Sequence, residues 1–203
     1  RVAILANNSD RYLEYYFSVW WAGAAVMPLN VRWSPSENAY SLNDGGAKIL
    51  FVDAYFSPDV AEICSKTDHD LTLIYIGDGD CPAGMLRYEE LIAKSDPIKD
   101  VEAGSDDLAG IFYTGGTTGR SKGVMLSHRN LLLNSIQFGP QLGFNQESIY
   151  LHSAPMFHLA NGAAMFAIAS AAGRSMNVTA FEPETVLKTI EEKKVSLALL
   201  VPT

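Results

Sequence analysis

A run of small and hydroxylated residues that ends in a lysine is the part of the sequence best suited to chemistry. From Ile111 to Gly123 it reads IFYTGGTTGRSKG, directly after an apolar, β-rich run. Glycines leave backbone N–H groups free to converge on an anion, because no Cβ blocks the approach or forbids positive φ. Threonine hydroxyls add donors, and Lys122 adds a compact charge that can reach a phosphate. The pattern predicts a loop that holds a polyphosphate.

This loop differs from the two frequent glycine-rich nucleotide motifs. The triphosphatase loop needs a lysine that follows glycine and precedes serine or threonine, whereas Lys122 stands between Ser121 and Gly123. The dinucleotide pattern Gly-x-Gly-x-x-Gly does not occur in the run either. A glycine-rich hairpin loop without a ligand is the alternative, but the length and order of the pattern favour a phosphate loop.

The run resembles the phosphate-loop signature YTSGTTGxPKG of the AMP-forming adenylating enzymes, which include acyl-CoA synthetases, luciferases and peptide-synthetase adenylation domains. Gly115 replaces the usual serine and Ser121 the usual proline, and both changes keep the residue small. The resemblance implies a catalytic role for Lys122 and an association of Thr114 with magnesium. It implies nucleotide contacts for Thr114, Gly115, Gly116, Thr117, Thr118, Gly119 and Lys122.

Two further segments extend the resemblance over nearly the whole chain. Residues 21–53, WAGAAVMPLNVRWSPSENAYSLNDGGAKILFVD, are similar to a scaffold stretch of acyl-CoA synthetases. Residues 154–162, APMFHLANG, are similar to the family's PLFHxxG segment, whose histidine helps to line the acyl pocket. This implies a substrate role for His158, although a lone histidine is more often a satisfied core residue. Small residues after it, such as Ala164 and Ala167, would leave room for an apolar tail.

The resemblance implies a reaction in which a carboxylic acid and ATP give an acyl-adenylate and pyrophosphate, followed by thioester formation with CoA. Mg²⁺ would accompany the ATP. The doubled Thr117-Thr118 and the MFH segment favour an acyl-CoA synthetase over an amino-acid adenylation domain, and the resemblance is closest to fatty-acid–CoA ligases. Three alternatives stay open: an amino-acid adenylation domain of peptide synthesis, a nucleotide-binding module without turnover, and a structural fragment that binds nothing.

Members of this family are more than twice as long as the present sequence. Downstream they carry a glutamate for magnesium, an aspartate for the ribose and a C-terminal domain with a further lysine. Residues 1–203 are therefore expected to be an incomplete N-terminal domain, with the phosphate loop at 111–123 and a surface excursion at about 77–104. We expect this stretch alone to be inactive, to hold a metal weakly, and to contain only a small part of any CoA site.

Composition narrows the class of partner. The net charge of -8 argues against a nucleic-acid partner, although Arg120, Lys122, His128 and Arg129 gather near the loop. Two cysteines without ligand spacing fit a reduced, cytoplasmic protein. The apolar stretch 154–173 is too short and interrupted for a transmembrane segment. Peripheral membrane association and a dimer are both compatible with the sequence, which leaves the oligomeric state open.

Strands alternate with helices almost throughout, which predicts an α/β fold with mostly parallel sheets covered by helices. The expected strands are residues 2–6, 24–29, 48–52, 71–76, 108–113, 123–126, 149–153, 175–178 and 196–201. The expected helices are residues 9–22, 35–45, 57–66, 88–94, 128–138, 158–172 and 183–193. The resemblance places this arrangement in the large N-terminal domain of an adenylate-forming enzyme.

Overall fold

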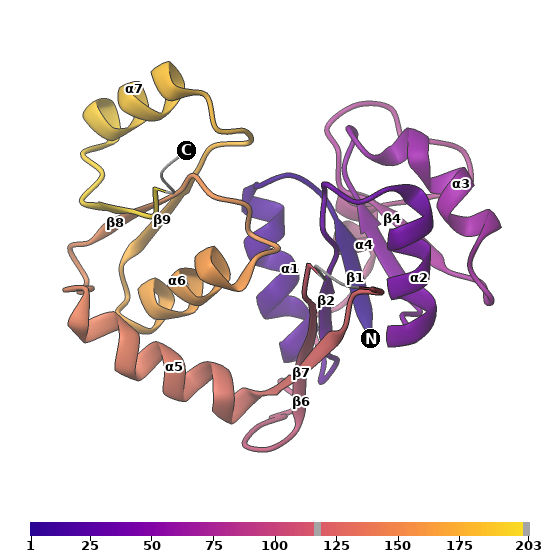
Figure 1. Cartoon of the computed structure of the whole chain (residues 1–203), viewed down its shortest axis with the longest axis horizontal. Coiled ribbons are helices and arrows are strands. Elements are labelled where there is room, and N and C mark those ends of the chain that lie inside the picture. The colour runs from indigo at the N-terminus through magenta and orange to yellow at the C-terminus, as the bar shows by residue number, and fades with distance from the viewer. Residues whose placement is uncertain (116–118, 201–203) are drawn as a thin grey trace.

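The computed structural model describes residues 1–115 and 119–200, and within them the strands form two sheets (Figure 1). The larger sheet has seven strands in the order β5-β4-β3-β1-β2-β6-β7, and the smaller has three in the order β10-β8-β9. Neighbouring strands run parallel except β6 and β7, which form an antiparallel hairpin. The predicted α/β fold with mostly parallel sheets is confirmed.

The strands are β1 (Val2–Leu5), β2 (Val26–Pro28), β3 (Ile49–Val52), β4 (Thr72–Tyr75), β5 (Leu86–Arg87), β6 (Leu108–Tyr113), β7 (Gly123–Ser127), β8 (Ile149–His152), β9 (Arg174–Asn177) and β10 (Leu197–Ala198). The helices are α1 (Asp10–Trp21), α2 (Pro35–Gly45), α3 (Val60–Ser65), α4 (Tyr88–Lys94), α5 (His128–Gln141), α6 (Leu159–Ser170) and α7 (Pro183–Lys193). A 3₁₀ turn, Ser57–Asp59, precedes α3.

Apolar side chains on both faces of the large sheet build its core. Ile4 and Val26 belong to a cluster that contains the tyrosines of α1, whereas Leu5 and Met27 point to the cluster that contains residues of α2 and α3. Successive side chains of a strand alternate between faces, so a strand buried on both sides must be apolar throughout. This explains why β1 reads as an uninterrupted apolar run.

Helix α1 connects the two halves of the molecule, as it lies between the large sheet and α6 (Figure 1). The ring centroids of Tyr16 and Phe166 are 5.5 Å apart, and those of Trp20 and Phe166 are 5.0 Å apart. The aromatic face of α1 therefore packs against the helix that follows the predicted acid-binding segment.

Small residues bring α5 and α6 close together beside the small sheet. A Cβ placed on Gly139 of α5 would lie 3.6 Å from the Cβ of Ala167. Ala164 and Ala167 both belong to the cluster that includes Phe144 and Tyr150. The room that these alanines were expected to give an apolar tail is therefore filled by packing within this chain.

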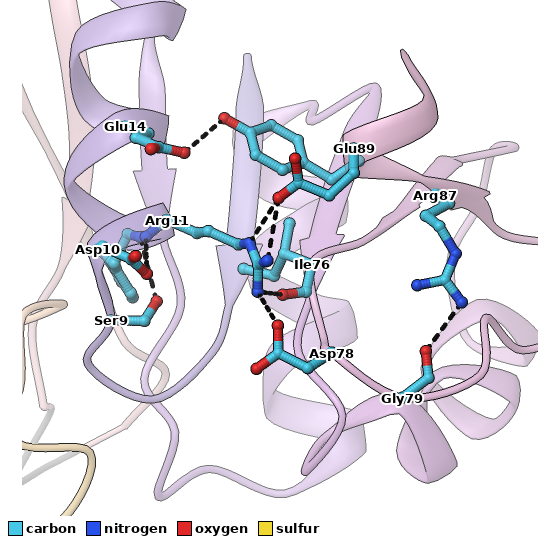
Figure 2. Close-up of polar contacts among 11 residues, drawn as sticks. Ser9, Asp10, Arg11, Glu14, Ile76, Asp78, Gly79, Arg87 and Glu89 are labelled. Carbon is cyan, nitrogen blue, oxygen red and sulfur yellow. Dashed lines mark hydrogen bonds and ion pairs between the residues drawn. The ribbon is translucent and has the colours of Figure 1, made fainter. Parts of the chain in front are cut away.

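The surface excursion is more ordered than its irregular sequence suggests, because it adds β5 to the edge of the large sheet. Figure 2 shows how Arg11 of α1 anchors this region. Its guanidinium donates to the Asp78 carboxylate at 2.6 Å, to the Ile76 carbonyl at 3.1 Å, and to one oxygen of Glu89 at 2.9 and 3.1 Å. One arginine thus ties both sides of the excursion to α1.

Replacing Arg11 with methionine is expected to expose the excursion to proteolysis while lowering the free energy of unfolding by only about 1 kcal/mol, because such partly exposed ion pairs are individually weak. Limited proteolysis with mapping of cleavage between residues 77 and 94, together with urea unfolding, measures both effects. Lys94→Met is the matched control, since it breaks only a pair with Glu90 on the surface of α4. Equal cleavage of Arg11→Met and wild type would contradict the anchoring role.

Among the described residues, every helix is too short or too polar to span a lipid bilayer.

Candidate functional site

The β6–β7 hairpin presents the predicted phosphate loop. Tyr113 pairs with Gly123, and the Thr114 N–H extends the ladder by donating to the Lys122 carbonyl at 3.0 Å. The Thr114 hydroxyl lies 3.5 Å from the same oxygen. The structure therefore brings Thr114 and Lys122 together at the base of the loop.

The described parts of the loop are open to an incoming ligand. Gly115, Gly119 and Lys122 are exposed, and a Cβ on either glycine would meet no atom within 4 Å. Gly119 has φ of +132°, which glycine adopts readily and other residues rarely do. These features fit a backbone that approaches phosphate oxygens closely. The predicted nucleotide residues Gly116, Thr117 and Thr118 lie outside the described residues.

Helix α2 supports the hairpin through a tyrosine next to the loop. The Tyr113 hydroxyl donates to Asp44 at 2.7 Å and lies 3.2 Å from the Ser41 carbonyl. Burial and the hydrogen bond to Asp44 raise the pKa of Tyr113, so the hydroxyl stays protonated and remains a donor. The sequence placed Asp44 only in a scaffold stretch, and nothing local linked it to Tyr113.

A tyrosine of α2 itself meets the far side of the loop. The Arg120 guanidinium lies 5.2 Å from the centroid of the Tyr40 ring, and the Tyr40 hydroxyl is 3.5 Å from the Ser121 carbonyl. A cavity of about 580 Å³ opens beside them. Its lining is Trp33, Ser36, Glu37, Tyr40, Gly115, Gly119, Arg120 and Ser121. This hollow is large enough to take part of a nucleotide.

Of the four basic residues near the loop, two are engaged in contacts within the chain and two are available to a ligand. Arg129 pairs with Asp106 at 2.9 Å, and the His128 ring packs edge-on against Trp20. Within the described residues, Lys122 forms no ion pair, and Arg120 faces the loop cavity. Among the described residues, the charge available to an anion therefore comes from Arg120 and Lys122, two of the four basic residues that the sequence had grouped near the loop.

The described residues do not form a magnesium site by themselves. Residues 1–115 and 119–200 contain no cluster of three His, Cys, Asp or Glu side chains that could hold a metal ion. Thr114 offers a hydroxyl, whereas Mg²⁺ prefers carboxylates, waters and substrate phosphates. The donor set therefore does not fit a resident ion, and the role of Thr114 toward magnesium remains a prediction.

His158 is exposed and begins α6. Its Nδ1 accepts a hydrogen bond from the Ala160 N–H at 3.1 Å, which makes the side chain the cap of that helix. The neutral ring then carries its proton on Nε2, which is left as a donor. Next to it, Phe157 lines a cavity of about 170 Å³ between the two sheets. The lining of that cavity is Ala6, Asn7, Asn8, Val31, Arg32, Ser153, Pro155, Phe157, Thr179, Ala180 and Phe181.

The two predicted halves of the site belong to separate cavities in the described structure. The cavity beside the loop and the cavity beside Phe157 share no lining residue among those described. The structure thus joins Thr114 to Lys122 but does not bring His158 to either of them. A nucleotide in one half and an acid in the other would have to meet across the carboxyl ends of the strands, where open α/β sheets commonly bind ligands.

The hairpin with the glycine-rich sequence between its strands stands at one edge of a mostly parallel sheet, so the described structure is that of an α/β protein. The family model for AMP-binding enzymes matches residues 1–203, so the chain belongs to this family.

Individual relatives and a solved structure agree with the family. The chain is 34% identical to a feruloyl-CoA synthase of Amycolatopsis over all of its length, which is 38% of that relative. It is 37% identical to a long-chain-fatty-acid–CoA ligase of Thermus thermophilus, over 78% of this chain and 29% of the relative. The crystal structure of ATP-bound MatB from Rhodopseudomonas palustris superposes with a TM-score of 0.80 at 30% identity, over 94% of this chain and 37% of that one. The chain thus spans well under half the length of these relatives.

Proposed function

We propose that the full-length protein activates a carboxylic acid with ATP as an acyl-adenylate and then transfers the acyl group to CoA. Residues 1–203 would supply the first part of the N-terminal domain, while the CoA site and the magnesium ligands would come mostly from elsewhere. The observation that carries the proposal is the β6–β7 hairpin, which presents Lys122 and open glycines beside a cavity. Membership of the AMP-binding family and the ATP-bound neighbour support it.

In the proposed reaction, a carboxylate oxygen forms a bond to the α-phosphorus of ATP while the bond to the bridging oxygen of the β-phosphate breaks. Negative charge then grows on the departing pyrophosphate. The Lys122 ammonium and the loop N–H groups would stabilise that charge where it develops, which is the largest contribution that such a site can make. Gly119, at positive φ, allows the backbone to follow the phosphates closely.

The acid is proposed to be a fatty acid bound with its carboxylate near His158. The Nε2–H of this exposed histidine is a suitable donor to a carboxylate or acyl-adenylate. An aromatic acid is the second candidate, because the feruloyl-CoA synthase matches over the whole chain. The packing of Ala164 and Ala167 against α5 means that the space for an apolar tail must come from elsewhere in the full-length protein.

Acid-dependent ATP–pyrophosphate exchange by the full-length protein tests this proposal. The panel should hold palmitate, hexanoate, ferulate and an amino acid, each with ATP and magnesium. We expect exchange that depends on the acid and is fastest with a fatty acid. Fastest exchange with the amino acid would favour peptide synthesis instead. ATP binding without exchange for any acid would point to a nucleotide-binding module without turnover.

A further inference from the structure

Asn8 joins the large sheet to the segment that carries the predicted acid-site histidine. It follows β1 and is 6% exposed. Its amide nitrogen donates to the carbonyls of His152 at 3.1 Å and Ala154 at 2.8 Å, and its amide oxygen accepts from the Met156 N–H at 2.8 Å. Both N–H groups of the amide are therefore used, and every partner is more than 140 positions away in the sequence.

The same segment is also held from two helices. Asn161 of α6 donates to the Ala154 carbonyl at 2.6 Å, so this oxygen receives a hydrogen bond from each of two asparagines. The Tyr16 hydroxyl of α1 donates to the Met156 carbonyl at 3.3 Å. A carbonyl with two lone pairs is saturated by two donors, which fixes the peptide plane in one orientation.

The fixed peptides lead directly into the predicted acid site. Pro155 and Phe157 line the cavity between the sheets, and the His158 N–H donates to the Pro155 carbonyl at 3.3 Å. The orientation of the Ala154–Met156 peptides therefore determines where the His158 ring sits relative to β1. Hydrogen bonds inside a buried site hold a single geometry, and a misplacement of about 1 Å can cost up to about a hundredfold in rate.

We propose that Asn8 is a positioning residue for acid activation, which sets the place of the Pro155–His158 turn relative to the large sheet. This inference rests on the proposed function, because it takes His158 to face the acid. Asn8 acts through the turn. Its loss should therefore weaken use of the acid and leave use of the nucleotide nearly unchanged, since the loop of β6 and β7 has separate supports on α2.

The test is the steady-state kinetics of Asn8→Ala in the full-length protein. We expect the KM for the acid to rise about tenfold while the KM for ATP stays within about twofold. Asn43→Ala is the matched control, because the Asn43 amide also bridges two segments, donating to the Lys66 carbonyl at 3.1 Å and accepting from the Asp68 N–H at 2.8 Å. This control lies outside the turn and should leave the acid KM unchanged.

Two further variants keep the inference open to refutation. Asn8→Ser retains a short hydroxyl and should give an intermediate acid KM, which provides the measurement if Asn8→Ala does not fold. His158→Ala shows whether the histidine serves the acid at all. If His158→Ala raises the acid KM and neither Asn8 variant does, the positioning role of Asn8 is overturned while the proposed acid site stands. If His158→Ala leaves the acid KM unchanged, the acid-site placement on which the inference rests is overturned.

Discussion

Replacing Lys122 with alanine in the full-length protein is expected to lower kcat/KM for adenylate formation by about 30- to 1,000-fold, which corresponds to about 2–4 kcal/mol of transition-state stabilisation. Lys122 is exposed at the base of the loop, where its backbone carbonyl accepts from the Thr114 N–H, and its ammonium group forms no ion pair among the described residues. It is therefore free to meet the charge that grows on the departing pyrophosphate. Because that charge is larger in the transition state than in bound ATP, kcat should fall more than the affinity for ATP.

Acid-dependent pyrophosphate release, measured over a range of ATP concentrations, gives both kcat and kcat/KM. Lys188→Ala is the control, since Lys188 is an exposed lysine on α7 whose ion pair within residues 1–115 and 119–200 is with Glu192, at 3.8 Å. Its rate should match wild type. A Lys122→Ala protein that releases pyrophosphate at the wild-type rate would remove the catalytic assignment, whatever its ATP affinity.

The sequence predicted those parts of the fold that depend on local chemistry. Ser9, Ser34 and Ser127 stand at the starts of expected helices, and each is an N-cap whose hydroxyl accepts from a backbone N–H in the first turn. Gly46 ends α2 in the left-handed conformation that glycine adopts without strain. Signals of this kind act over four residues, so they are readable without knowledge of the tertiary structure.

The predictions were less exact where distant packing decides the outcome. The helix expected from Ser57 begins as a 3₁₀ turn, and α3 starts only at Val60. Helix α5 extends past Phe138 to Gln141 although Pro140, which has no N–H to donate, lies in its last turn. The short strand β5 was not expected, because its pairing with β4 depends on a neighbour outside its own sequence.

In the candidate site, too, some residues could be predicted from local sequence and others depend on distant contacts. The loop residues could be recognised from their order alone, and the structure places Thr114 beside Lys122 as a hairpin requires. Asp44 and Asn8 could not be recognised, because each acts on a segment far away in the sequence. An asparagine after a strand has no local signature that distinguishes a buried bridge from an ordinary turn residue.

His152 is a buried group whose importance emerges only from the structure. Its side chain is fully buried, with Nδ1 3.1 Å from the Asn161 amide oxygen and Nε2 3.2 Å from the Ser175 hydroxyl. The Tyr150 ring packs edge-on at 4.8 Å. Desolvation lowers the pKa of His152 from 6.5 to about 4, even though the contact with Asn161 favours the charged form. The ring is therefore neutral in the folded chain at neutral pH.

The free energy of unfolding is expected to fall as the pH drops from about 6.5 to about 4, with His152 contributing about 3 kcal/mol of the loss. Over this range the unfolded chain binds a proton on His152 that the folded chain rejects, so acid favours unfolding. Above pH 6.5 the ring is neutral in both states and its contribution is constant.

The test is urea unfolding of wild type and His152→Gln, measured from pH 4 to pH 7.5. The difference between their free energies of unfolding isolates His152, because the carboxylates titrate in both proteins and their effects cancel. We expect the advantage of wild type over the variant to shrink steadily with falling pH. An NMR titration of the His152 ring with a midpoint between pH 6 and pH 7 in the folded chain would contradict this account.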